Sequence, residues 1–290
     1  MPRDEEAQSG PGEFGDVVDV HLLDESLPLA ARIARAPAHG SAKAMALVLA
    51  GGEPVVQIAE TVPQGVDDWK RAAAGPLALT VERPLEHWTL SLDAPGARVT
   101  LDLSALTPPA DLAEPATAAI GRAANLRRYA QLCRARGTAE VAGREHAIDA
   151  AAIRSHRWGP LGEAGRARFL TVASEDGVLL TVAAVRQGGG GGHGEELVGG
   201  FTTAPGTGAD PAALPFETVR LSTVFDQDGL PVKLGAELFR PGDELPSRLA
   251  GVALGAVAGA IDGRRTSLTL FRLGLDGQPA LGSYEIETGP

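Results

Sequence analysis

The chain has 290 residues, of which 44% are hydrophobic and 22% are charged, so it is long enough for two globular domains. Its formal net charge of −11 argues against a nucleic-acid partner, because phosphate binding needs clustered lysine and arginine. The single cysteine, Cys133, excludes an intramolecular disulfide, and no Cys/His spacing is typical of a zinc site. We therefore expect neither a metal nor another cofactor.

The chain shows no targeting or membrane-spanning pattern. Residues 1–13 are acidic and polar, the opposite of a signal peptide, and we expect them to be a disordered N-terminus. No apolar run approaches the roughly 18 residues of a membrane span. These features predict a cytoplasmic protein without an integral membrane segment, and they leave its oligomeric state open. The basic stretches Arg122–Arg136 and Arg144–Arg168 alternate with apolar residues, which favours solvated strand or linker faces.

The first half of the chain alternates apolar and polar residues with a period of two. Residues 67–74 (DDWKRAAA) are an exception, since aspartates followed by alanines favour a short helix. In 86–93 (EHWTLSLD) and in 97–103 (ARVTLDL) every second residue is apolar, as in half-buried antiparallel strands. We assign residues 14–109 to a first all-β domain.

Residues 110–128 follow the Pro108-Pro109 pair, are rich in alanine, and are predicted to be a linker with a helical part. The alternation then resumes at Tyr129, and we assign residues 129–290 to a second all-β domain. Further alternating segments occupy 168–173, 178–185, 219–224 and 267–275. Many short strands at this spacing, separated by Asp-Gly turns, predict sandwiches or barrels.

Two glycine-rich segments interrupt the second half. Residues 188–192 are all glycine and predict a flexible hairpin loop, since the lysine of a phosphate-binding loop is missing. Residues 249–261 carry Gly251, Gly255 and Gly259 at four-residue spacing, and are too short to span a membrane. A buried strand pair or a short core helix remains open for them.

One stretch of the second half carries a recognisable motif. It runs from Tyr129-x-Gln131 through Gly137–Gly143 to Arg154-x-His156-x-Trp158-Gly159. This pattern resembles a family of bacterial two-domain calycin-like proteins related to carotenoid 1,2-hydratases. The chain departs from that pattern at Ser155, where the family often has aspartate, and at Leu161, where it often has arginine.

The resemblance implies two lipocalin-like antiparallel β-barrels in tandem, joined by a short helical linker, with an apolar cavity. It also implies cofactor-free chemistry on hydrophobic substrates, because relatives hydrate isoprenoid double bonds, cyclise terpenoids, or fold polyenes for pericyclic reactions. The periodicity of the sequence by itself supports only the β architecture.

The motif places three polar or aromatic side chains on one face of a strand. Arg154, His156 and Trp158 share that face, because alternate residues of a strand point to the same side. An imidazole there could move a proton, and an indole could stabilise a developing cation. The alternative is a structural row, with the arginine stacked on a tryptophan and the histidine bonded to a backbone carbonyl.

Acid-catalysed hydration or cyclisation also needs a carboxylic acid kept protonated by an apolar wall. The carboxylates considered for this role are Asp226, Asp228, Glu285 and Glu287. Asp228-Gly229 fits a hairpin turn, so Asp226 is the expected second catalytic residue beside His156. Glu287 either lines the pocket or faces outward with Glu285 if Tyr284 faces the core. The expected pocket residues are Arg154, Trp158, Trp88, Tyr129 and Glu287.

These observations predict a cofactor-independent enzyme, a hydratase or cyclase of the lyase or isomerase type, in terpenoid or natural-product metabolism. Its partner would be a hydrophobic isoprenoid or polyene molecule, held in a reactive conformation by the cavity. The same barrels could instead serve as a non-catalytic binder or carrier of an apolar molecule. A third possibility is a structural protein whose barrels are filled by side chains.

Overall fold

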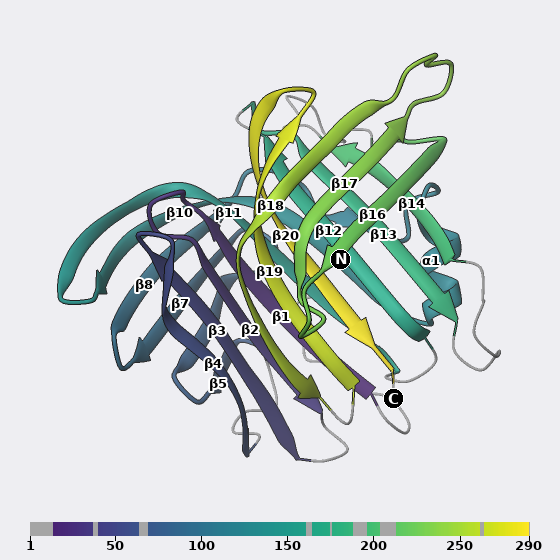
Figure 1. The fold of residues 1–290 in the computed structure, drawn as a ribbon. Coiled ribbons are helices and arrows are strands. Elements are labelled where there is room, and N and C mark those ends of the chain that lie inside the picture. The colour runs from purple at the N-terminus through teal and green to yellow at the C-terminus, as the bar shows by residue number, and fades with distance from the viewer. Residues whose placement is uncertain are drawn as a thin grey trace. The chain divides into compact units, whose positions relative to one another are not determined.

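The computed structural model describes residues 14–36, 40–63, 69–160, 164–174, 176–187, 196–203, 213–261 and 264–289. The predicted disordered segment 1–13 and the predicted loop 188–192 lie outside the described residues. Where the chain is described, no helix has the length and apolar character needed to cross a membrane. The one helix in these ranges, α1 (Ala118–Ala124), has 7 residues. The all-β fold class with a short helical segment is confirmed (Figure 1).

The chain forms two compact units, and neither is a single stretch of sequence. Unit 1 comprises Met1–Pro109 and Gln131–Leu161, and unit 2 comprises Ala110–Ala130 and Gly162–Pro290. This division differs from the predicted barrels at 14–109 and 129–290 and from the predicted linker at 110–128. The physical reason is strand pairing, because Val99 and Leu101 of unit 1 pair with Ala139 and Gly137.

Unit 1 is one antiparallel sheet in the strand order β4-β3-β2-β1-β11-β10-β8-β7-β6-β5. Its strands are β1 (Phe14–Leu23), β2 (Leu29–Ala36), β3 (Ser41–Ala50), β4 (Glu53–Pro63), β5 (Arg71–Ala74), β6 (Leu77–Arg83), β7 (His87–Ala94), β8 (Ala97–Ala105), β10 (Arg127–Val141) and β11 (Arg144–Pro160). Short β9 (Ala110–Asp111) pairs with the start of β10, and these paired residues belong to the segment Ala110–Ala130 that is assigned to unit 2. The sheet curls until its two edges meet, since a Cβ on Gly75 after β5 would overlap the Glu60 carboxylate of β4.

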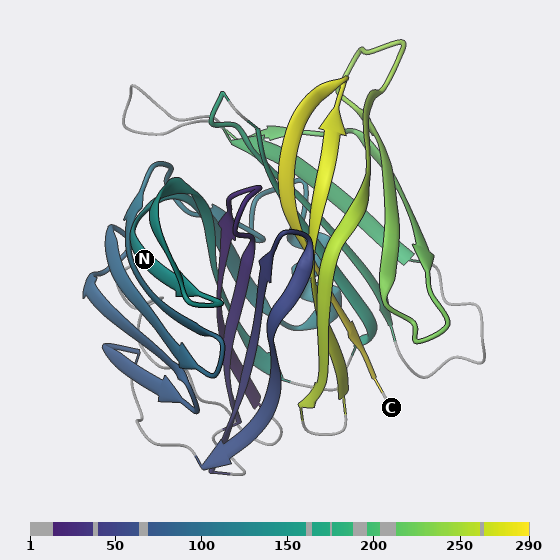
Figure 2. The same cartoon turned by 60° about the vertical axis from the view of Figure 1, so that its left-hand side comes forward.

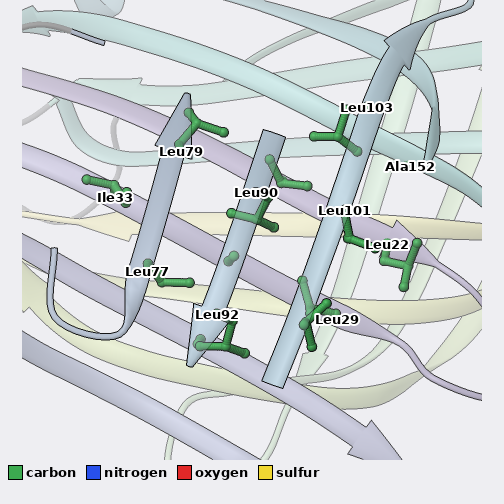
Figure 3. Packing of buried hydrophobic residues seen from close by; sticks show 14 of the residues in the cluster. Leu22, Leu29, Ile33, Leu77, Leu79, Leu90, Leu92, Leu101, Leu103 and Ala152 are labelled. Atoms are coloured by element: carbon green, nitrogen blue, oxygen red, sulfur yellow. The ribbon is translucent and has the colours of Figure 1, made fainter. Parts of the chain in front are cut away.

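The interior of the unit 1 barrel is filled by apolar side chains. In β8 burial alternates strictly, with Val99, Leu101 and Leu103 inside, as the period-two pattern predicts. Figure 3 shows Leu101 and Leu103 beside Leu90 and Leu92 of β7 and Leu77 and Leu79 of β6. Cys133 packs in the same cluster as a small buried residue.

Unit 2 is a second antiparallel sheet in the order β15-β14-β13-β12-β20-β19-β18-β17-β16. Its strands are β12 (Ala164–Ser174), β13 (Leu179–Gln187), β14 (Glu196–Thr203), β15 (Leu214–Pro215), β16 (Thr218–Phe225), β17 (Pro231–Phe239), β18 (Ser247–Ile261), β19 (Arg264–Leu275) and β20 (Gln278–Thr288). The sheet closes through the segment after β15, where Phe216 N donates a 3.0 Å hydrogen bond to Gly200 O. Figure 2 shows the curl of this sheet from a second direction.

Three local predictions have clear outcomes. The helix predicted over 67–74 is wrong for the described part, because Trp69-Lys70 form a turn and Arg71–Ala74 form β5. The helical part predicted within 110–128 is confirmed as α1, which packs through Ile120 and Ala124 on Ala167 and Phe169 of unit 2. The glycine-rich segment 249–261 is a strand within β18.

The basic stretches are not simply solvated. Arg128, Arg157 and Arg168 are each 5% exposed or less, whereas the alternation of the basic stretches predicts solvated faces. Their burial requires compensation by acidic or aromatic partners, because an unpaired buried charge is costly.

Candidate functional site

The predicted row Arg154, His156 and Trp158 lies on β11 and faces the interior of the unit 1 barrel. Ala152, on the same face of β11, belongs to the barrel core. His156 is fully buried, and its Nε2 lies 2.7 Å from Oδ1 of Asp16 on the neighbouring strand β1. Strand pairing creates this contact, since Val18 and Asp16 of β1 lie opposite His156 and Trp158.

Asp16 is the centre of a buried polar cluster at one end of this barrel. Besides His156, its carboxylate accepts hydrogen bonds from Trp69 Nε1 at 2.8 Å and from Arg35 at 3.3 Å. The ring of His156 also lies near two indoles, with centroid distances of 5.8 Å to Trp69 and 4.7 Å to Trp158. A buried carboxylate with this many donors is well compensated.

Arg154 makes a different contact on the same face of β11. Its guanidinium lies 4.4 Å from the ring centroid of Trp88 on β7, so two predicted pocket residues stack directly on each other. These contacts agree with the alternative in which the row is structural, except for the partner of the histidine. The arginine stacks on Trp88, and the histidine bonds a carboxylate where a backbone carbonyl was considered.

Ser155, which lies between Arg154 and His156, points to the opposite face of β11. Its hydroxyl lies 3.2 Å from Asp19, whose carboxylate also binds Arg32 at 2.5 and 2.9 Å. The side chains of Asp19 and Arg32 are fully buried. Each face of the β2–β1–β11 layer thus carries its own buried aspartate with a cationic or imidazole partner.

One small cavity lies among the described core residues of unit 1. The cavity found among its core side chains has a volume of about 10 Å³ and is lined by residues such as Val18, Ile33, Leu79 and Leu90. That is about the volume of one water-sized probe, too small for an organic substrate. His156 and Trp158 do not line it.

A much larger cavity lies in unit 2, at the end of the barrel formed by the β12–β13 and β19–β20 turns and the β17–β18 loop. Its volume is about 470 Å³. The residues that line it are Ser174, Asp176, Val178, Leu180, Thr202, Phe216, Leu238, Arg240, Ser247, Leu275, Asp276, Gln278 and Pro279. Leu180, Phe216 and Leu238 are buried core residues, so the floor of the cavity is apolar.

Arg240 is the cation of this cavity. Its guanidinium lies 5.3 Å from the ring of Phe216, and its Nη2 donates a 3.2 Å hydrogen bond to Thr202. The carboxylates of the lining are at the exposed rim, where Asp276 accepts a 2.7 Å hydrogen bond from the Arg248 amide. The cavity therefore combines an apolar floor with one fixed guanidinium donor.

The other expected site residues lie elsewhere. Asp226 is exposed in the β16–β17 turn, and its Oδ1 accepts hydrogen bonds from the amides of Asp228 and Leu230 at 2.9 and 2.8 Å. A protonated catalytic acid needs apolar surroundings. Among the described residues Asp226 does not have them, because its side chain is exposed and its carboxylate binds the amides of the turn. The Asp228-Gly229 turn is present as predicted.

The predicted alternative for Glu287 is only half right. Tyr284 faces the barrel core, so Glu285 and Glu287 lie on the opposite face of β20, yet both are buried, at 1% and 6% exposure. Arg128 compensates Glu285 through a 2.6 Å ion pair. Tyr129 is also buried, and it pairs with Asp111 on β9. Neither Tyr129 nor Glu287 lines the cavity of unit 2.

Sequence reasoning missed Asp16, Arg240 and the cavity itself. The sequence does carry one signal for Asp16, because it stands in the largely apolar strand β1. A carboxylate on a buried strand needs a hydrogen-bonding or cationic partner. Nothing local marks Arg240, because the cavity arises where three separate turns meet. Within the described ranges, no group of three or more His, Cys, Asp or Glu side chains is placed to hold a metal ion.

Comparisons with known proteins place this fold. A protein assigned as AttH from Nitrosomonas europaea is 13% identical, with a TM-score of 0.65 over 98% of this chain and 94% of that one. CghA with Sch210972 is 15% identical, with a TM-score of 0.59 over 95% of this chain and 88% of that one. CghA alone is 14% identical, with a TM-score of 0.56.

At these identities the likeness concerns the fold alone, and the relation to carotenoid hydratases stays a prediction. No curated protein sequence matches this chain. The model of a domain of unknown function, DUF7064, matches residues 16–289, which is nearly the whole chain. The protein therefore belongs to the DUF7064 family.

Proposed function

We propose that the protein is a cofactor-independent barrel enzyme that binds a small hydrophobic molecule, of the polyene or isoprenoid type, in the cavity of unit 2. The observation that carries this proposal is the cavity of about 470 Å³ over the apolar floor of Leu180, Phe216 and Leu238. Small-molecule sites typically have about 300–1,000 Å³ with a few placed polar groups. In unit 1, by contrast, the cavity among Val18, Ile33 and Leu79 has a volume of about 10 Å³.

Among the two expected reactions, the geometry favours cyclisation over hydration. Hydration of a double bond needs an acid whose pKa is raised by burial. Of the described lining residues, the carboxylates are Asp176 and Asp276, and both are exposed. A cyclisation that depends on shape needs only a folded substrate and a hydrogen-bond donor, and the Arg240 guanidinium is such a donor at a carbonyl or carboxylate.

The fold of CghA supports the same direction, because that protein has been solved with Sch210972 and so accommodates a small molecule. This is an analogy of fold, and function depends on the site. The second candidate is a non-catalytic carrier for the same class of molecule. It is favoured because Asp226, the predicted proton donor, is exposed in a turn and does not line the cavity.

The test uses a matched pair of tryptophan substitutions in unit 2. Val178→Trp fills the cavity, since Val178 lines it, whereas Val224→Trp adds the same bulk at a residue that is 54% exposed and lies outside the lining. Purified wild type and both variants are incubated with a set of linear polyenes and analysed by mass spectrometry. Native mass spectrometry on the same samples measures binding.

We expect binding and product formation with wild type and Val224→Trp, and a loss of at least tenfold with Val178→Trp. Arg240→Gln should retain binding of the apolar portion and lower turnover. Binding without turnover in every sample would establish the carrier function. Equal binding by Val178→Trp and wild type would overturn the assignment of the cavity.

A further inference from the structure

The opposite end of the unit 2 barrel carries a row of arginines on its inner face. Arg166 of β12 pairs with Arg186 of β13, which pairs in turn with Glu196 of β14. Paired residues of antiparallel strands point to the same side. That side is the barrel interior, because Leu180 and Val182 share the face of Arg186 and belong to the core.

Another arginine on this face, Arg168, is already neutralised by a glutamate. Arg168 is buried and binds Glu196 through two contacts, of which the one from Nε is 3.0 Å. Its Nη1 also donates to the Tyr284 hydroxyl at 3.2 Å and to Thr223 at 3.3 Å. The donors of Arg168 and the charge of Glu196 are thus used within the barrel.

Arg166 and Arg186 lack this compensation. Among the residues that the structure describes, neither forms an ion pair, and the buried Nε of Arg186 has no hydrogen-bond partner. Arg166 lies 5.0 Å from the ring of Phe225. Burial lowers the pKa of the Arg166 guanidinium, and the charge of Arg168 lowers it further. Two cations therefore lie near each other in a partly buried place, and the neighbouring carboxylate of Glu196 is already bound to Arg168.

A third cation continues the row but is differently engaged. Arg265 of β19 lies opposite Thr288, which pairs with Arg166. Its guanidinium donates to the backbone carbonyl of Asp228 and is exposed. Arg265 therefore lies at the exposed end of the arginine row, and its hydrogen bond to the β16–β17 turn holds its guanidinium there.

We propose that Arg166 and Arg186 form a binding site for the phosphoryl group of a small molecule at this end of the barrel. The charges match, since a phosphate monoester carries about −1.5 to −2 at pH 7 and the two guanidinium groups carry the opposite charge. Guanidinium groups also bind phosphate oxygens in a bidentate geometry. This proposal does not depend on the proposed function, because the cavity with Arg240 lies at the other end of the barrel.

The experiment measures anion binding to the full-length protein by isothermal titration calorimetry at constant ionic strength. The ligands are inorganic phosphate, octyl phosphate and octanoate. The site variant is Arg166→Gln/Arg186→Gln. The control is Arg220→Gln, which removes one cation from an exposed pair with Glu237. Circular dichroism checks the fold of each variant, and the single Arg186→Lys variant retains the charge if the double variant fails to fold.

We expect saturable binding of phosphate or octyl phosphate, weakened at least tenfold in the site variant and unchanged in the control. Tighter binding of octyl phosphate than of phosphate would identify a phosphorylated organic ligand, and equal binding would identify free phosphate. Arg186→Lys should weaken binding severalfold, because lysine cannot make the bidentate contact. Absence of saturable binding, equal binding by the site variant, or octanoate binding as tight as octyl phosphate overturns the proposal.

Discussion

The imidazole of His156 and the carboxylate of Asp16 form a buried pair, with 2.7 Å between Nε2 and Oδ1 and no exposed surface on either side chain. The two residues are 140 positions apart in the chain, and they meet because β1 pairs with β11. Trp69 and Arg35 bind the same carboxylate. This pair joins the start of β1 to the end of β11.

The first prediction concerns this pair. His156→Ala should lower the free energy of unfolding by about 3–5 kcal/mol, because it leaves the buried carboxylate of Asp16 without one of its partners. Urea denaturation monitored by tryptophan fluorescence measures the change. His87→Ala is the control, since His87 lies 3.7 Å from Asp102 in a partly exposed pair and should cost less than about 1 kcal/mol.

The same variant tests the acid–base role predicted for His156. Loss of turnover with an unchanged unfolding free energy would favour that role and contradict the structural one assigned by these contacts.

The second prediction tests the packed interior of unit 1. Leu101→Ala should destabilise the protein by about 2–5 kcal/mol, because the fully buried side chain leaves a void among its neighbours. Leu106→Ala, at a residue that is 48% exposed, should change stability by less than about 1 kcal/mol. Thermal and urea unfolding compare the two. Similar small effects of both variants would mean that the barrel interior contains more space than described.

The third prediction concerns Gly251 in the glycine-rich strand β18. A Cβ at this position would overlap the carbonyl oxygen of Arg272 and lie 2.8 Å from Leu273 Cα, on the paired strand β19. Gly251→Ala should therefore destabilise the protein by about 1–3 kcal/mol. Gly274→Ala is the matched control, because the nearest atom to its added Cβ lies at 3.9 Å. A Gly251→Ala protein as stable as the control variant would refute the close approach of the two strands.

The fourth prediction is a pH dependence on the surface of unit 1. Hydrogen bonds from Arg134 and then Arg136 lower the pKa of Asp149 from 3.8 to about 2. Because the folded-state pKa is depressed, the stabilisation is fully present above about pH 4 and disappears as the pH falls toward 2. Asp149→Asn should remove this dependence, and Arg134→Gln should raise the carboxyl pKa toward 3.8. Carbon-detected NMR titration follows the carboxyl directly, and a wild-type pKa near 4 would contradict the ion pair.

The strands were predictable from the sequence because their signal is local. In β8 and β7 the alternation of apolar and polar residues corresponds directly to alternation of buried and exposed side chains. The helix expected at 67–74 failed for a non-local reason. Trp69 is held by Asp16, more than 50 positions earlier, and the alanines after it pair with β6. Tertiary contacts outweighed helix propensity there.

The site was only partly predictable. The motif around His156 correctly indicated a shared face on one strand, since that follows from strand geometry. Its partner Asp16 and the cavity beside Arg240 depend on which strands and turns meet, and one sequence carries no signal for that pairing. The buried arginines Arg128 and Arg168 were misjudged for the same reason, because their glutamate partners lie on other strands.

The two-segment composition of each unit has a practical consequence for anyone who wishes to study one barrel alone. The chain crosses from one unit to the other three times, after Pro109, after Ala130 and after Leu161. A single cut after Leu161 keeps the strands of each sheet together, β1–β11 on one side and β12–β20 on the other, but it separates α1 from Ala167 and Phe169, on which it packs. The apolar side chains that α1 covers would then be exposed, which promotes aggregation. An isolated unit 2 would therefore have to carry residues 110–130 joined to 162–290 by a designed connector.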